Sequence, residues 1–179
     1  MKSQQLIGLI FVSALLGGCA TPASVDQMTT KQSPLQVQPQ SAALKRSVVV
    51  RDVTGGRETN PMWTSQVSND AFRRAIEDSL RSAGILGGGS GTRFRLTADM
   101  IRLDQPMFGA SMTVSSQVRY SLVEISTGKE VYGRVIDASY TAAWNASFLA
   151  TERLRMANEG SVRENIDALL KDLSLLKVN

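Results

Sequence analysis

Three stretches in which apolar and polar residues alternate, joined by short turns, constrain the fold of this chain more than any other feature. The stretches are 93–103, 112–122 and 130–142. Alternation with a period of two is typical of strands that bury one face. In the first stretch the alternation changes phase between Met100 and Arg102, which predicts a β-bulge. Turns at 106–109 and 126–129 connect the stretches, and such short connections favour antiparallel hairpins.

The flanking segments add one strand and further helices. The run Ser47–Val53 is rich in valine and predicts a strand that is covered on both faces or lies in the middle of a sheet. Apolar residues at helical spacing up to Ala83 predict a helix that begins at Asn60-Pro61 and ends at Gly84. The order β-α-β-β-β-α predicts an α+β fold, a two-layer sandwich in which a four-stranded mixed sheet carries helices on one face.

The C-terminal third contains two helical stripes, 146–157 and 162–176, which are offset from each other across Gly160. Ser161 to Glu164 matches a capping box, in which a serine caps a helix and a glutamate three positions later returns the hydrogen bond. This pattern predicts either a kink at Gly160 or a second helix that begins at Ser161.

The inventory of reactive residues excludes several functions. The chain has one cysteine, Cys19, and no histidine. A disulfide within the chain is therefore impossible, as are metal sites built from histidine and cysteine and catalysis by Ser-His-Asp or Cys-His sets. The formal net charge of +4 is too small to indicate nucleic-acid binding. We therefore expect no metal, no cofactor, no nucleic-acid partner and no catalytic residues.

The first twenty residues carry the most specific signal. The apolar run Leu6–Leu16 is shorter than the roughly 20 residues that a membrane-spanning helix needs, so it fits a signal peptide. It ends in Leu16-Gly17-Gly18-Cys19, which resembles the lipobox of bacterial lipoproteins. The resemblance implies cleavage between Gly18 and Cys19 and acylation of Cys19, which would hold the protein on a membrane through two or three acyl chains. The alternative is a secretory signal followed by an incidental cysteine.

The residues after the cysteine bear on location and domain organisation. Ala20 stands where an aspartate would resemble the signal for retention in the inner membrane. The resemblance therefore implies the outer membrane of a Gram-negative cell, with the protein on the periplasmic face. The following polar segment is rich in proline and glutamine and shows no periodicity, which predicts a flexible tether. We expect a signal peptide at 1–18, a lipidated cysteine and tether at 19–43, and a single domain at 44–179.

The chain as a whole is similar to small outer-membrane lipoproteins of Gram-negative bacteria. The similarity rests on Leu16–Cys19, on the helix end at 82–86 and on the hairpin at 126–132. Members of this group include the lipopolysaccharide-assembly lipoprotein that plugs a translocon barrel, auxiliary lipoproteins of lipid-transport ABC systems, and uncharacterised lipoproteins of similar length.

Lipidation, a compact domain and the lack of a catalytic set favour a non-enzymatic accessory protein of the envelope, which binds a protein partner or a lipid head group. Basic residues that could contact lipid phosphates, or could be ordinary solvated charges, are Lys45, Arg46, Arg51, Arg57, Arg93 and Arg95. Among them, the four arginines Arg51, Arg57, Arg93 and Arg95 are the candidate contact residues. Apolar residues beside turns that could form a contact patch, or could pack in the core, are Met62, Trp63, Met107 and Phe108.

Two other functions remain open. A periplasm-facing hydrolase would need a pair of carboxylates as general acid and base. Carboxylates in or beside the expected strands are Asp99, Asp104, Glu124, Glu130 and Asp137. The protein could also be a purely structural component of an envelope or secretion complex. The sequence does not distinguish this role from that of a binding protein. Between these, we expect a binding protein and not an enzyme.

Overall fold

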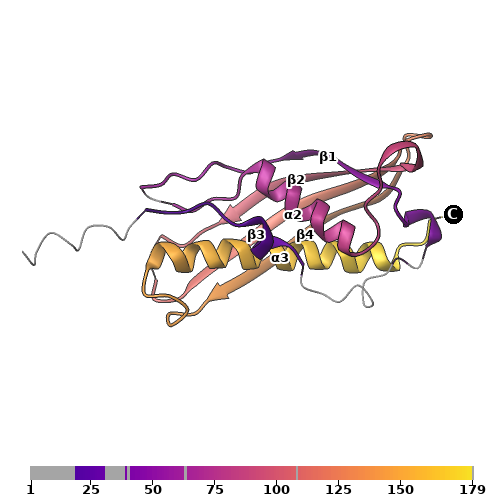
Figure 1. Ribbon diagram of the computed structural model, residues 1–179. Coiled ribbons are helices and arrows are strands. Elements are labelled where there is room, and N and C mark those ends of the chain that lie inside the picture. The colour runs from indigo at the N-terminus through magenta and orange to yellow at the C-terminus, as the bar shows by residue number, and fades with distance from the viewer. Residues whose placement is uncertain (1–18, 31–38, 40, 63, 108, 179) are drawn as a thin grey trace, which may run out of the picture.

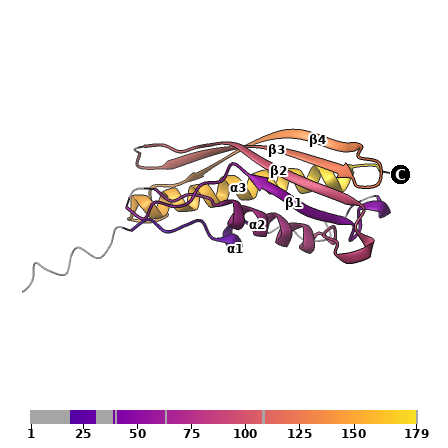
Figure 2. The ribbon, with the colours of Figure 1, turned by 90° about the horizontal axis from the view of Figure 1, so that it is seen from above.

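The computed structural model describes residues 19–30, 39, 41–62, 64–107 and 109–178. Its elements, in chain order, are α1 (Val25–Met28), η1 (Ala42–Leu44), β1 (Val48–Thr54), α2 (Asn69–Ser82), η2 (Gly89–Gly91), β2 (Phe94–Asp104), β3 (Met112–Glu124), β4 (Glu130–Ala142) and α3 (Ala150–Leu175). The strands form a sheet in the order β1-β2-β3-β4, with β1 parallel to β2 and the other neighbours antiparallel. Helices α1, α2 and α3 lie on one face of this sheet (Figures 1 and 2), so the predicted α+β sandwich is confirmed.

The alternating pattern of β2 explains its place in the sheet. Phe94, Leu96 and Ala98 are buried against the helices, and the residues between them point to the uncovered face. The pairing of β2 with β3 shifts register between Met100 and Arg102, which confirms the predicted bulge. Helix α2 makes the crossover that the parallel pair β1 and β2 requires.

The predicted start of the first long helix at Asn60-Pro61 is wrong. The Asn60 side chain instead accepts a hydrogen bond from the Met62 backbone N–H (3.0 Å), which stabilises a tight turn. Helix α2 begins at Asn69, where the Ser68 hydroxyl accepts a hydrogen bond from the Ala71 N–H (3.2 Å) and caps the helix. The helical spacing of buried residues starts only after this point, at Phe72.

The predicted capping box at Ser161 is also wrong, because α3 continues without a break through Gly160. Gly160 packs against the ring of Tyr140 on β4, and a Cβ at this position would overlap the ring atoms. The glycine therefore permits a close approach of helix and sheet and does not end a helix. Ser161 lies in the helix interior, where its hydroxyl is buried and has no hydrogen-bond partner among the described residues.

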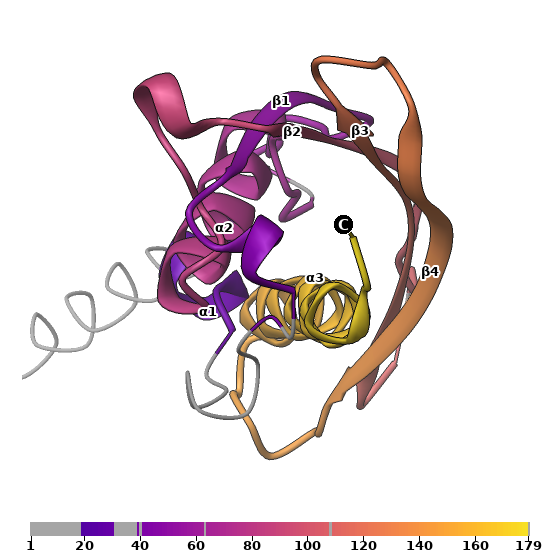
Figure 3. The same cartoon turned by 90° about the vertical axis from the view of Figure 1, so that its right-hand side faces the viewer.

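Helix α3 packs against β3 and β4, inside the curve of the sheet, and α1 and α2 lie beside it on the same face (Figure 3). Its Asn165 side chain joins two strands: the amide accepts a hydrogen bond from the Tyr120 hydroxyl (3.0 Å) and donates one to the Ile136 carbonyl (2.9 Å). Burial raises the pKa of Tyr120 well above its usual value, so this phenol stays a donor. No described helix is long and apolar enough to cross a membrane.

The expected tether differs from the structure over residues 19–30, which we call the N-terminal segment. Ala20 and Ala23 donate backbone hydrogen bonds to the connection between β1 and α2, at Pro61 (2.7 Å) and Gln66 (3.1 Å). Met28 is fully buried and joins the main hydrophobic core. The segment is therefore part of the domain. Residues 31–38 and 40, also assigned to the tether, lie outside the described residues.

Candidate functional site

Cys19, the expected lipid-attachment residue, is exposed at one end of the elongated domain. Its neighbour Ala20 is buried and hydrogen-bonded to Pro61. Consecutive Cα atoms lie about 3.8 Å apart, so Cys19 cannot move far from the folded domain while Ala20 stays in place. Gly18, on the other side of the expected cleavage site, lies outside the described residues.

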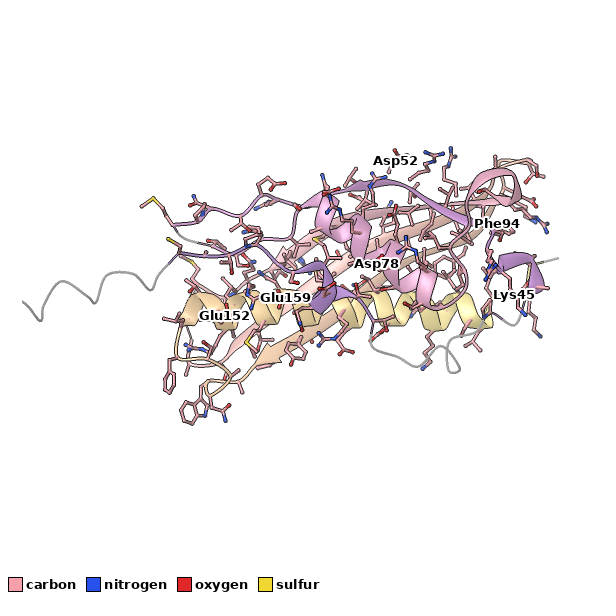
Figure 4. All side chains as sticks on the ribbon, viewed as in Figure 1. Lys45, Asp52, Asp78, Phe94, Glu152 and Glu159 are labelled. Atoms are coloured by element: carbon pink, nitrogen blue, oxygen red, sulfur yellow. The ribbon has the colours of Figure 1, made fainter. Side chains whose placement is uncertain are left out.

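A buried carboxylate holds the N-terminal segment on α3. Oε1 of Glu159 accepts hydrogen bonds from the Ser24 backbone N–H (2.8 Å) and from Nη1 of Arg155 (2.7 Å). Burial raises the pKa of Glu159, against the opposing effects of Ser24 and Arg155. Arg155 also pairs with Glu152, and the hydrogen bond from Arg155 lowers the pKa of that more exposed carboxylate. Both glutamates lie in the first half of α3, toward Cys19 (Figure 4).

The structure brings together only two of the four arginines proposed to contact lipid phosphates. Arg51 and Arg95 line one hollow of about 440 Å³ on the uncovered sheet face. Arg57 lines a different hollow. Arg93 forms an ion pair with Glu124 (2.8 Å) and is thereby partly neutralised. The four therefore do not form a single basic site. Lys45, from the wider set, lies at the end of the domain opposite Cys19 (Figure 4).

Two of the five strand carboxylates share a hollow. Asp104 and Asp137 line an open depression of about 360 Å³ on the uncovered sheet face. Asp104 forms an ion pair with Arg102 (3.0 Å), and Asp137 accepts a hydrogen bond from Gln117 (2.7 Å).

The other three carboxylates are spread along the strands. Asp99 accepts a hydrogen bond from Thr54 (2.8 Å), and Glu130 is exposed at the start of β4. The pKa of Glu124 is lowered by hydrogen bonds from Thr127 and Arg93. Among the described residues, no group of three or more acidic residues, cysteines or histidines could hold a metal ion.

The sheet face opposite the helices is broad, polar and uncovered. β3 and β4 are both 13 residues long, and their outward positions include Arg119 and Asp137, both exposed, and Gln117, which is half-buried. Val135 adds an exposed apolar side chain on β4. Within the described residues β4 pairs only with β3, so it also presents a free edge. Such a surface can accept another polypeptide across its face or along its edge.

Apolar side chains of the loops nearest Cys19 are unusually exposed. Met62 and Met107 expose 77% and 85% of their surface, so neither packs in the core. Trp63 and Phe108, predicted with them, lie outside the described residues. Sequence reasoning missed Trp144 and Phe148 in the connection from β4 to α3, which are 68% and fully exposed. Two large aromatic residues between asparagine, serine and alanine, in a segment without strand or helix periodicity, are the signal that could have found them.

Comparisons with known proteins establish the fold. No protein-family model matches the chain, and no curated protein sequence matches it. Protein XCC0632 from Xanthomonas campestris, described under the family model DUF330, has a TM-score of 0.55 at 12% identity over 74% of this chain and 87% of that one. A PelC dodecamer from Paraburkholderia phytofirmans has a TM-score of 0.51 at 14% identity, over 78% of this chain and 94% of that one.

A putative lipoprotein from Caulobacter crescentus gives a TM-score of 0.48 at 18% identity, over 74% of this chain and 90% of that one. The first two likenesses show that the chain shares its α+β fold with proteins of Gram-negative bacteria.

Proposed function

We propose that this protein is a lipoprotein of the bacterial envelope, anchored through acyl chains on Cys19 in the outer membrane with its domain in the periplasm. There it acts as a non-enzymatic accessory protein that binds another envelope component. The observation that carries the binding role is the uncovered sheet face: the described helices all lie on the other side, which leaves long strands and a free edge open to a partner.

The anchor is supported by the sequence Leu16-Gly17-Gly18-Cys19 and by the exposure of Cys19 at an end of the domain. Each buried methylene contributes about 0.8 kcal/mol, so two or three acyl chains make attachment effectively permanent. Attachment to the same membrane raises the effective concentration of the domain around its partner. Because of this, modest contacts suffice for binding.

Replacement of the cysteine tests the anchor. The Cys19→Ala protein should remain an unprocessed precursor that incorporates no fatty-acid analogue, because no other residue can form the thioether to the lipid. Metabolic labelling followed by phase partitioning measures both properties. Label retained by Cys19→Ala, at the level of the unchanged chain, would disprove acylation at this residue.

Site-specific photo-crosslinking in intact cells tests the binding surface. Crosslinkers at Gln117 and Val135 sample the uncovered face, and one at Arg74, exposed on α2, is the matched control on the opposite side. We expect both sheet positions to capture the same protein, Arg74 not to capture it, and Arg119→Glu to reduce capture. If the sheet positions capture a phospholipid instead of a protein, the partner is a lipid head group. Equal capture from Arg74, or none from the sheet, contradicts the assignment.

The shared hollow of Asp104 and Asp137 is the observation that favours the alternative, a hydrolase. Each carboxylate is already engaged by a neighbouring side chain, which supports a structural role for both. Turnover of a peptidoglycan or lipid substrate that is lost in both Asp104→Asn and Asp137→Asn would replace the binding proposal with this one.

A further inference from the structure

Four segments that are distant in sequence meet at the end of the domain where Cys19 lies, which we call the Cys19 end. They are the start of the N-terminal segment at 19–25, the connection from β1 to α2 at 59–69, the turn from β2 to β3 at 105–111, and the connection from β4 to α3 at 143–149. Figures 1 and 2 place all four at the same end, and the C-terminus and the turn from β3 to β4 at the other.

The Cys19 end carries no charged side chain in any of these four segments, whether or not their residues are described. The uncharged stretches continue into the strands, as far as Val118 in β3 and back to Ala138 in β4. By contrast, Lys45 lies at the opposite end (Figure 4), where Lys129 and Lys177 line a hollow together with Phe94. The four loop segments at this end therefore contain no charged residue, in a chain whose residues are 20% charged.

Large apolar side chains project from three of these loops. Met62, Met107 and Trp144 are each more than two-thirds exposed, and Phe148 is fully exposed. Leu149, beside Phe148, is also exposed. Scattered single apolar residues are normal on a protein surface, but a concentration of them on one uncharged end marks a contact with an apolar environment.

Contacts within the domain fix the conformation of these loops, so their apolar side chains are held in exposed positions. A second small core of Met112, Val114, Ala142, Leu154 and Ala157 fills the base of this end. In the connection from β4 to α3, the Ser147 carbonyl accepts a hydrogen bond from the Arg153 guanidinium (2.6 Å).

A hydrogen-bond network also ties the loops to each other. The Gln105 amide donates to the Ser65 carbonyl (2.9 Å) and to the Asn158 side chain (2.7 Å), and Asn158 donates to the same carbonyl (2.9 Å). This network joins the turn from β2 to β3, the connection from β1 to α2, and helix α3. The loops of the Cys19 end are therefore braced as one unit.

We infer that the Cys19 end is a membrane-contact surface whose apolar tips enter the interface of the lipid bilayer beside the anchor. This inference rests on the proposed acylation of Cys19. Because Ala20 is packed against Pro61, acyl chains on Cys19 bring the surrounding loops to the bilayer surface, and no slack separates them. Tryptophan and other amphipathic aromatic residues favour this interface, and buried charge would oppose entry. The lipid thus fixes the orientation of the domain as well as its attachment.

Depth-dependent quenching of a single tryptophan tests the contact. The chain has two tryptophans, so Trp63→Phe leaves Trp144 alone. The processed, lipidated protein is reconstituted into vesicles of phosphatidylethanolamine and phosphatidylglycerol, with and without brominated acyl chains. We expect brominated lipid to remove about half or more of the Trp144 fluorescence, since interfacial side chains sit about 5–10 Å into the headgroup and acyl boundary.

A matched control places the probe at the other end, as Trp63→Phe/Trp144→Phe/Ser126→Trp in the exposed turn from β3 to β4, where no quenching is expected. Met107→Glu and Phe148→Glu should each reduce the quenching of Trp144, and Val135→Glu on the sheet face should not. These changes lie at exposed positions, so folding should be preserved.

The outcomes separate the two proposals. Protein that carries the lipid mass and floats with vesicles, but shows no quenching of Trp144, overturns the membrane contact and leaves the anchor intact. If the protein lacks the lipid mass and does not float with vesicles, the proposed anchor is overturned, and the membrane contact that depends on it is overturned as well. Trp144 that is shielded from aqueous acrylamide but not quenched by brominated lipid indicates that a second copy of the chain covers this end, which also overturns the inference.

Discussion

Replacement of Met28 by alanine tests whether the N-terminal segment belongs to the fold, on which the position of Cys19 depends. The Met28 side chain is fully buried in the main core, and its helix α1 contacts both α2 and α3. Its burial contributes about 1.5–3 kcal/mol, and the cavity left by truncation raises the cost of a Met→Ala change to about 2–5 kcal/mol. Backbone hydrogen bonds at Ala20, Ala23 and Ser24 hold the segment independently of Met28. We therefore expect the segment to stay docked, so that the cavity remains and the free energy of unfolding falls by this full amount.

Urea unfolding of the chain without residues 1–18, with Cys19→Ser, measures this free energy. This chain contains every described element. In a domain of this size each kcal/mol should also lower Tm by about 2–4 °C. Gln27→Ala, an exposed change on the same short helix, is the control and should alter stability by less than about 0.5 kcal/mol. If Met28→Ala is as mild as this control, the segment is a tether after all, and the orientation argued from Ala20 is lost.

Three further changes concern α3. Gly160→Ala should destabilise the domain by about 1–3 kcal/mol in urea unfolding, because the new Cβ overlaps the Tyr140 ring, and Tyr140→Ala should relieve part of this cost. Ser161→Ala should leave stability unchanged or raise it, since the buried hydroxyl has no described partner; a loss of about 0.5–2 kcal/mol would indicate a helix cap instead. Burial raises the pKa of Glu159, so the folded state holds its proton more tightly than the unfolded chain. The parent should therefore lose stability relative to Glu159→Gln as pH rises from about 4.3 through the raised pKa, and a difference that is flat with pH would contradict this.

The parts of the fold that could be predicted from sequence are those in which local pattern and tertiary burial agree. In β2 the alternation of side chains is itself the burial pattern, and the phase change at Met100 is the bulge. The order of strands and helices then leaves few topologies, because a short turn forces an antiparallel pair and a helical crossover permits a parallel one.

The parts that could not be predicted depend on contacts between residues far apart in sequence. Gly160 looks like a helix end, because glycine is unfavourable inside helices, but its reason is the ring of Tyr140 on a neighbouring strand. The N-terminal segment looks like a linker because only Ala20, Ala23 and Met28 of its residues are buried apolar side chains. The segment is otherwise held by hydrogen bonds such as that between Ser24 and Glu159, and these produce no periodic pattern in the sequence.

The candidate site shows the same division. The motif at Cys19 is local and could be recognised directly, whereas the surface around it is assembled from loops that only the fold brings together. Met62 and Met107 stood out because they lie beside turns, but Trp144 and Phe148 gained significance only when the fold placed the connection from β4 to α3 at the same end of the domain as the start of the N-terminal segment. The proposed basic set failed as a group because Arg93 is occupied by Glu124 and Arg57 lies beside another hollow.

The docked N-terminal segment also changes what the proposed anchor implies for binding. A flexible tether would let the domain sample all orientations at a distance from the bilayer. With Ala20 packed, the strands instead run from the Cys19 end toward the opposite end of the domain. β3 has 13 residues, and at a rise of about 3.3 Å per residue it spans about 40 Å. A domain seated on its Cys19 end would hold the uncovered sheet face upright over that distance. A partner would then meet a polar surface that is held in one orientation beside the membrane. The same geometry explains why the loop segments of the Cys19 end contain no charged residue while the sheet face does.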